Sequence, residues 1–125
     1  MGNPTHPKFL PSEFQCHCGK CSKGFEHMRS PLLTKLYALR DAYNKPITIT
    51  SAMRCQEHNS AVSNAKNSAH LRGWAVDIKF RTMQEGYDLI ALITELGFKR
   101  FGIKYSAGII HVDDDPGLPP GLIPY

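Results

Sequence analysis

Apolar and polar residues alternate in several short stretches of the chain, and this period of two is typical of half-buried β-strands. In the stretch 74–80, one side is apolar and consists of Trp74, Val76, Ile78 and Phe80. The other side of the same stretch carries Ala75, Asp77 and Lys79. The β-branched stretch 47–51 and the stretch 109–113 show a similar alternation. A Ser-Ala-Gly turn joins 109–113 to residues 100–105, which predicts a hairpin and hence a small sheet.

Two longer segments, 30–44 and 83–96, carry apolar residues mostly at steps of three and four, which predicts amphipathic helices. Each begins with a Ser or Thr at the N-cap position, and the second ends at Gly97. We expect a shorter helical segment within residues 55–65. A polar loop from Asn64 to Ser68 would then lead into the stretch 74–80.

Both ends of the chain are rich in proline, which cannot occupy the middle of a sheet or a helix. Residues 1–14 are expected to form an extended arm anchored by burial of Phe9, Leu10 and Phe14. Residues 115–125 are expected to form a tail that wraps the surface and does not continue a sheet. Between the arm and the tail we predict one domain.

Length and composition fit an ordinary globular domain. A chain of 125 residues is long enough to bury one core without staples, so we expect residues 1–125 to form a single domain and a monomer. No apolar run approaches the roughly 20 residues of a membrane span. The net charge of +4 comes without a Lys/Arg run, which argues against nucleic-acid binding. The first residues lack the pattern of a secretory signal, so we expect synthesis without a signal peptide.

Three of the four cysteines fall in the run Cys16-His17-Cys18-Gly19-Lys20-Cys21, whose spacing resembles half of a zinc-binding knuckle. The fourth, Cys55, is distant in the sequence. Three states remain open from the sequence: small buried thiols, a structural metal site, or a disulfide between Cys55 and one of the first three.

A second set of residues suggests a catalytic metal. His70 precedes the turn that leads into the stretch 74–80, Asp77 lies on the polar side of that stretch, and His111 lies on 109–113. Two imidazoles and one carboxylate are the three protein ligands of a catalytic zinc, which keeps a fourth position for water. Taken singly, each of these residues could instead be an ordinary surface or core side chain, and Asp113 to Asp115 a solvated acidic turn.

Three motifs resemble, in order, those of the zinc D-Ala-D-Ala carboxypeptidase family, which also contains peptidoglycan endopeptidases. The segment Ser68-Ala69-His70-Leu71-Arg72-Gly73-Trp74-Ala75-Val76-Asp77-Ile78 resembles the signature S-x-H-x-x-G-x-A-x-D-[IV]. Ile49-Thr50-Ser51-Ala52-Met53-Arg54 with Asn59 is similar to the element I-T-S-x-x-R…N, and Gly108-Ile109-Ile110-His111-Val112-Asp113 to the closing G-x-x-H-x-D. The resemblance implies a small α+β domain with a central antiparallel sheet flanked by helices, the architecture of the hedgehog signalling domain.

By this resemblance His70, Asp77 and His111 are the zinc ligands, and Arg54 binds substrate through its guanidinium fork. The alternative for Arg54 is a surface cation. The implied mechanism is attack on a peptide carbonyl by zinc-bound water, whose pKa such a site lowers to about 7.

The general base is less clear, because some relatives carry Glu, Asp or His three residues before the last ligand, where this chain has Gly108. We predict Asp113 in that role, since it shares a strand face with His111. Asp113 could instead orient a ligand or be structural. Asp114 and His58 are further candidates for the base.

The resemblance therefore implies a zinc-dependent peptidase that hydrolyses the peptide stems of bacterial peptidoglycan, either as a carboxypeptidase or as an endopeptidase. We expect a phage or prophage endolysin, made in the host cytoplasm without a signal peptide and acting in the periplasm or cell wall. Two alternatives stay open. One is a catalytically silent, metal-stabilised module that binds the wall or has a structural role, and the other is an interaction protein whose metal sits at the cysteines.

Overall fold

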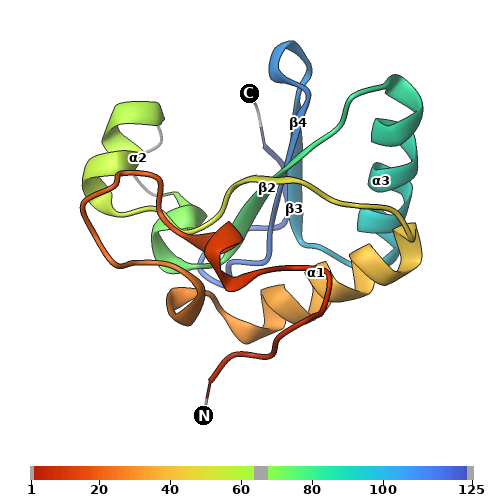
Figure 1. Ribbon diagram of the computed structural model, residues 1–125. Helices are drawn as coiled ribbons and strands as arrows, with labels where there is room; N and C mark the ends of the chain where they lie inside the picture. Colours follow the sequence, from red (N-terminus) through yellow and green to blue (C-terminus); the bar gives the residue numbers. More distant parts are fainter. Residues whose placement is uncertain (1, 64–67, 124–125) are drawn as a thin grey trace.

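The computed structural model of the protein describes residues 2–63 and 68–123 (Figure 1). Within these residues the α-helices are α1 (Ser30–Tyr43), α2 (Gln56–Val62) and α3 (Met83–Glu95). The strands are β1 (Ile49–Ser51), β2 (Ala75–Lys79), β3 (Arg100–Lys104), β4 (Ile109–Asp113) and β5 (Gly121–Leu122). Short 3-10 helices include η1 (Pro11–Phe14), η2 (Phe25–His27), η3 (Ala69–Arg72) and η4 (Tyr105–Ala107).

The strands form one sheet in the order β1-β2-β4-β3-β5. The first four pair antiparallel, and β5 pairs parallel with β3 at the edge. The predicted α+β class with a central antiparallel sheet is thereby confirmed. The expectation that the tail does not continue the sheet is wrong at its last part, because Gly121 and Leu122 pair with Arg100 and Phe101. This edge position needs hydrogen bonds from only one side of the tail, which a proline-rich segment can supply.

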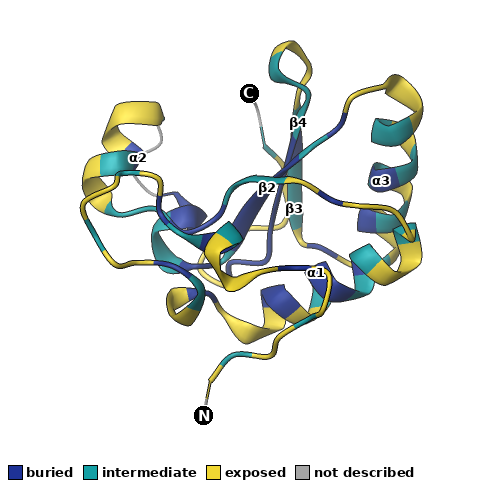
Figure 2. Cartoon of the chain, in the orientation of Figure 1, coloured by how far each residue is buried: buried dark blue, intermediate teal, exposed yellow. Residues whose placement is uncertain are grey.

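The core lies on one face of the sheet, where α1 and α3 pack side by side (Figures 1 and 2). The strands contribute Val76, Ile78, Ile110 and Val112, and the helices contribute Leu32, Leu33, Leu36, Leu39, Leu89 and Ile93, all fully buried or nearly so. Because side chains alternate along a strand, the residues between them on β2 and β4 point to the opposite face. That opposite face carries Asp77, His111 and Asp113.

The boundaries of α1 and α3 lie within one residue of the predicted ones. The N-cap predicted at Ser30 is wrong, because Arg29 holds that position and its side chain makes no capping hydrogen bond, whereas the N-cap predicted at Thr82 is confirmed. The hydroxyl of Thr82 accepts a hydrogen bond from the amide of Glu85 at 3.1 Å, which caps α3. Asn44 ends α1 in the left-handed conformation, at φ 55°. Among the described residues, none of the helices combines the length and the apolarity that crossing a bilayer requires.

The N-terminal arm is anchored by two of its three predicted apolar residues. Phe9 and Phe14 are buried, whereas Leu10 is 65% exposed, so the prediction for Leu10 is wrong. The reason is local: Pro11 begins η1 directly after Leu10, and that turn directs Phe14 into the core instead. The predicted loop from Asn64 to Ser68 lies outside the described residues except for Ser68.

Candidate metal centre

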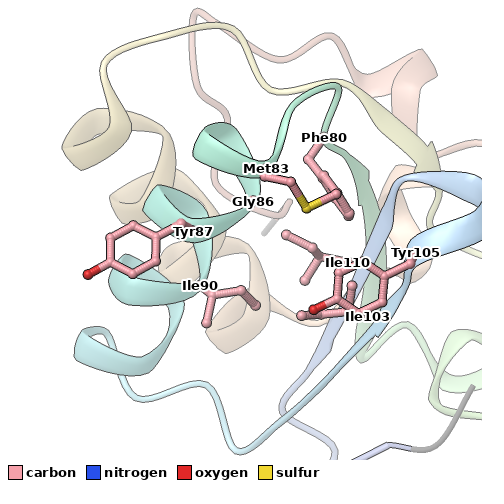
Figure 3. Close-up of a pocket in the computed structure, with 8 residues that line it drawn as sticks. All are labelled: Phe80, Met83, Gly86, Tyr87, Ile90, Ile103, Tyr105 and Ile110. Carbon is pink, nitrogen blue, oxygen red and sulfur yellow. The ribbon is translucent and has the colours of Figure 1, made fainter.

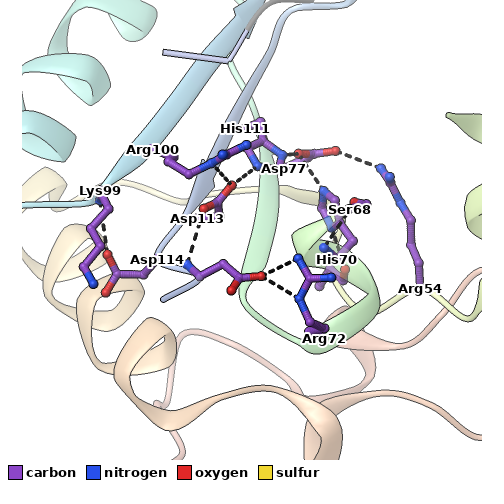
Figure 4. Close-up of polar contacts among 12 residues, drawn as sticks. Arg54, Ser68, His70, Arg72, Asp77, Lys99, Arg100, His111, Asp113 and Asp114 are labelled. Carbon is purple, nitrogen blue, oxygen red and sulfur yellow. Dashed lines mark hydrogen bonds and ion pairs between the residues drawn. The ribbon is translucent and has the colours of Figure 1, made fainter. Parts of the chain in front are cut away.

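The three predicted ligands meet at one point, although they come from three separate segments (Figure 4). Asp77 on β2 and His111 on β4 are direct partners in the antiparallel register, so their side chains project side by side. Oδ1 of Asp77 lies 2.9 Å from Nδ1 of His111 and 3.1 Å from Nε2 of His70. The two imidazole rings lie 5.0 Å apart, nearly perpendicular to each other. One nitrogen from each ring and one carboxylate oxygen therefore converge.

His70 reaches this point because a tight turn precedes β2. The hydroxyl of Ser68 accepts a hydrogen bond from the amide of His70 at 3.2 Å and so caps η3. Gly73 ends η3 with φ 77°, a left-handed conformation that glycine adopts without strain. A side chain at this position would collide with the carbonyl of His27, so the glycine of the motif is required twice over.

Each imidazole has its second nitrogen fixed by a buried partner. Nδ1 of His70 lies 2.7 Å from the carbonyl oxygen of Ala52, and Nε2 of His111 lies 2.7 Å from Oδ2 of Asp113. Both partners are acceptors, so each of these nitrogens carries a proton and donates. The other nitrogen of each ring, the one that faces Asp77, is then the nitrogen that offers its lone pair to a metal when the ring is neutral.

The guanidinium of Arg54 lies on the far side of the same carboxylate. Its Nη2 donates to Oδ2 of Asp77 at 3.1 Å, and its side chain is only 11% exposed. Nε donates to the hydroxyl of Ser51 at 3.0 Å, and Nη1 to the side-chain oxygen of Asn59 at 3.3 Å. Arg54 is therefore held by three partners, and the alternative of an exposed surface cation is wrong.

Burial and neighbouring charges shift the pKa values of Asp77, His70 and His111 in different directions. Burial would raise the pKa of Asp77, but the neighbouring His70 and His111 together hold it well below its ordinary value. Burial lowers the pKa of His70. Burial also opposes charge on His111, yet its hydrogen bonds to Asp113 and Asp77 raise its pKa overall. In the metal-free protein Asp77 is thus anionic, while the two histidines differ in how readily they lose a proton.

These donors fit a zinc ion. Zinc takes imidazole nitrogen and carboxylate oxygen, and a three-ligand set of this kind is typical of catalytic sites. The second nitrogen of a zinc-binding histidine normally donates to a carbonyl or a carboxylate, which fixes the tautomer. His70 with Ala52 and His111 with Asp113 have this arrangement. The residues present could therefore hold the metal that the sequence implied.

The acidic run 113–115, which begins at the last residue of β4, is buried and ion-paired. The alternative of a solvated acidic turn is therefore wrong. Asp113, Asp114 and Asp115 are each less than one tenth exposed. Each carboxylate meets a different cation, with Arg100 at 3.2 Å from Asp113, Lys35 at 2.9 Å from Asp114, and Arg72 at 2.6 Å from Asp115. These ion pairs join β3, α1 and the turn carrying His70 to the end of β4.

The position of Asp113 bears on its predicted role as general base. Its side chain is completely buried between Nε2 of His111 and Nε of Arg100. These contacts favour the alternative in which Asp113 orients a ligand, and its role as base stays a prediction. Asp114 pairs with Lys35 and with the backbone amide of Lys99, away from the convergence point. Burial, Arg54 and His17 lower the pKa of His58.

The backbone around position 108 requires a glycine there. Gly108 follows η4 in the hairpin turn with φ 63°, and a Cβ atom there would lie 2.6 Å from the carbonyl oxygen of Phe80. The amide of Phe80 also donates to the carbonyl of Gly108 at 2.8 Å, which ties the turn to the end of β2. A side chain at position 108 is thus sterically excluded.

A separate apolar pocket of about 240 Å³ lies between α3 and the hairpin (Figure 3). Its lining includes Ile110, which points away from the face that carries His111, because neighbours on a strand alternate. The remaining lining residues are Phe80, Met83, Gly86, Tyr87, Ile90, Ile103 and Tyr105. None of these lining residues is an acid or a histidine, so the pocket is not part of the candidate metal centre.

Two features of the site were not predicted from the sequence. The backbone carbonyl of Ala52 has no sequence signal at all. Arg100 could have been suspected only from its place opposite Asp113 in the predicted hairpin, where a cross-strand ion pair is common.

Comparison with known families agrees with this geometry. Residues 7–113 match the family model described as Peptidase M15. The match covers part of the arm, the strands β1 to β4, and Arg54, His70, Asp77, His111 and Asp113. No curated protein matches the chain.

Proposed function

The chain belongs to the peptidase M15 family, and we propose that it is a zinc-dependent peptidase that hydrolyses the peptide stems of bacterial peptidoglycan. One observation carries the proposal: within the matched region His70, Asp77 and His111 bring three metal-ligating atoms within 4.8 Å of one another, all from buried side chains. A zinc ion bound there would polarise a peptide carbonyl and lower the pKa of water.

The ligands are prepared for a metal by their partners. The carbonyl of Ala52 and the carboxylate of Asp113 each accept the proton of one ring nitrogen, so both rings direct their other nitrogen at the same point. Preorganisation of this kind removes the cost of ordering the ligands when the metal binds.

Arg54 is the residue that we propose for substrate. Its guanidinium lies against Asp77, directly beside the convergence point, and is held by Ser51 and Asn59. Because a guanidinium donates from a planar fork and stays charged, it suits the carboxylate of a stem peptide or an oxyanion that forms during hydrolysis. Its contacts with Ser51 and Asn59 fix the direction of that fork.

Proton transfer is the open step of the proposal. Gly108 has no side chain to take part, and Asp113 contacts His111 and Arg100. We propose that Asp113 acts on the reaction through His111, by fixing the ring and stabilising its protonated nitrogen. A direct role as base is the competing assignment, and the zinc dependence of Asp113→Asn separates the two.

The experiment that tests the function is mass spectrometry of muropeptides before and after incubation of purified peptidoglycan with the zinc-loaded protein. We expect shortened stem peptides. Loss of a terminal D-alanine would identify a carboxypeptidase, and release of one stem from another an endopeptidase. Unchanged muropeptides with zinc bound at the His70 site would contradict the proposal. The His70→Ala protein is the matched control for contaminating hydrolases.

One observation favours a second candidate function. Gly108 stands where some relatives carry a proton-transferring side chain, and the surrounding backbone excludes one. A metal-stabilised module that binds the wall without cleaving it is therefore the rival. Co-sedimentation with insoluble peptidoglycan, combined with an unchanged muropeptide profile, would support it.

We further propose an endolysin role, with the protein made in the bacterial host and acting in the periplasm or the cell wall, where the substrate lies. The net charge of +4 would favour approach to an anionic wall. Expression inside bacteria with and without a holin tests this location. Lysis that requires both genes is the expected outcome.

A further inference from the structure

The four cysteines, which take no part in the site above, form a second cluster. Cys16, Cys18 and Cys21 lie on the loop that follows η1, and Cys55 lies between β1 and α2. Their four sulfur atoms all lie within 4.8 Å of one another, and those of Cys18 and Cys21 are 3.4 Å apart. Four thiolates bound at about 2.3 Å around one zinc ion would be separated by roughly 3.8 Å, so the cluster has the required size.

Backbone amides are directed at three of these sulfurs. The amides of Lys20 and Cys21 donate to Sγ of Cys18 at 3.2 and 3.3 Å. The amide of Cys55 donates to Sγ of Cys16 at 3.3 Å, and the amide of His58 donates to Sγ of Cys55 at 3.4 Å. Hydrogen bonds of this kind stabilise thiolate over thiol, and the thiolate is the form that binds a metal.

The other two states expected from the sequence account for less of this arrangement. Cys16 is buried, but Cys18, Cys21 and Cys55 are partly exposed, so filling the core does not explain them. All four are free thiols, and one disulfide would use two sulfurs and leave the remaining two unexplained. A tetrahedral metal uses all four at once.

We propose that Cys16, Cys18, Cys21 and Cys55 hold a structural zinc ion, in addition to the metal at His70, Asp77 and His111. Four protein ligands leave no open coordination position, so this ion would have no catalytic water. The inference goes beyond the proposed function and does not depend on it, because it concerns residues outside that site.

A zinc ion at the four cysteines would also stabilise part of the candidate metal centre at His70, Asp77 and His111. Cys55 directly follows Arg54, and the amide of Met53 donates to the carbonyl of Phe14 at 3.3 Å. Fixing Cys55 to the N-terminal loop would therefore hold the segment 52–55. This segment supplies the carbonyl that orients His70 and the guanidinium that contacts Asp77.

Zinc content per chain tests the proposal on the full-length protein. We expect two zinc ions in the wild type and one in Cys18→Ser/Cys21→Ser, with its helical circular dichroism retained. Lys20→Ala is the matched control: it alters an exposed side chain of the same loop without removing a sulfur, and should keep both ions. A folded double-cysteine variant that retains the zinc content of the wild type overturns the proposal.

A second readout needs no variant and so remains decisive if the double-cysteine chain fails to fold. We expect wild-type protein reconstituted with cobalt(II) to show strong sulfur-to-cobalt charge-transfer absorption, which a site of histidine and aspartate cannot give. Its absence, or a natively purified chain whose mass shows a disulfide, overturns the proposal. Neither readout uses peptidase activity. A protein without peptidase activity can therefore still bind zinc at its cysteines, and an active peptidase can lack this zinc.

Discussion

The carboxylate of Asp113 lies 2.7 Å from Nε2 of His111, two residues earlier on the same strand face, and is fully buried there. The contact fixes which nitrogen of His111 is protonated and leaves Nδ1 directed at Asp77, 2.9 Å away. The imidazole of His111 thus lies between the carboxylates of Asp113 and Asp77. This arrangement makes Asp113 the residue whose substitution is most informative.

For Asp113→Asn we expect zinc affinity at the His70 site to fall by about 10- to 100-fold, because the partner that fixes a zinc-binding histidine is altered. If Asp113 acts through His111, saturating zinc should restore most of the activity. Zinc titration combined with peptidoglycan hydrolysis measures both. Full zinc occupancy with no recovery of activity would assign Asp113 as the direct base instead. Asp88→Asn, which changes a half-buried carboxylate on α3 outside the site, is the control.

For Arg54→Lys we expect kcat/KM to fall by about 10²- to 10³-fold, although the positive charge remains, because an ammonium cannot keep the three fork contacts while facing substrate. Zinc content should stay at the wild-type value. Steady-state kinetics on a purified stem peptide, together with metal analysis, check this. A wild-type kcat/KM in Arg54→Lys would show that Arg54 has a purely structural role. Arg81→Lys provides the matched exchange on the surface.

For His70→Ala we expect loss of peptidoglycan hydrolysis and loss of the metal at this site, while the helical circular dichroism is largely kept. The core packs on the opposite face of the sheet, so its apolar contacts do not depend on this imidazole. Exposed His27 serves as the control in His27→Ala. Undiminished cleavage by the His70 variant would remove His70 from the ligand set.

Zinc binding should strengthen as pH rises, and His111 should set the dependence. An ordinary histidine has a pKa of about 6.5. The pKa of His70 is lowered, so this ring is neutral at that pH, whereas the pKa of His111 is raised, so this ring is still protonated there. Zinc must displace that proton, so its affinity increases until the pH passes the pKa of His111 and is then constant. Competition with a chromophoric chelator between about pH 6 and pH 8 measures this. A flat profile over that range would contradict it.

For Gly108→Ala we expect a loss of stability greater than the roughly 1–3 kcal/mol of a strained backbone alone, because the added Cβ also meets the carbonyl of Phe80. Gly97→Ala is a matched control with a similar positive φ of 79° and no atom within 4 Å of its Cβ position. Urea unfolding of both variants separates strain from collision. Equal losses at the two positions would show that the contact with Phe80 is relieved easily.

Local pattern was enough to predict most of the elements and the identity of the candidate ligands. The alternation in 74–80 and 109–113 determined which residues face the core, because neighbours on a strand point to opposite sides. It therefore also determined that Asp77 and His111 share the other face. Thr82 and Gly97 marked the two ends of α3, because capping signals act within one turn of the chain. Ser30 marked the start of α1 but does not cap it.

Only the tertiary structure decided the partners. Asp113, Asp114 and Asp115 form one run in the sequence, yet their cations lie 13, 79 and 43 residues away, and no local period relates them. The carbonyl that orients His70 and the approach of Cys55 to the other cysteines likewise depend on how distant segments pack. Sequence pattern determines which face a side chain takes, because that choice depends on the neighbouring residues. Which group it meets there depends on the packing of the whole domain.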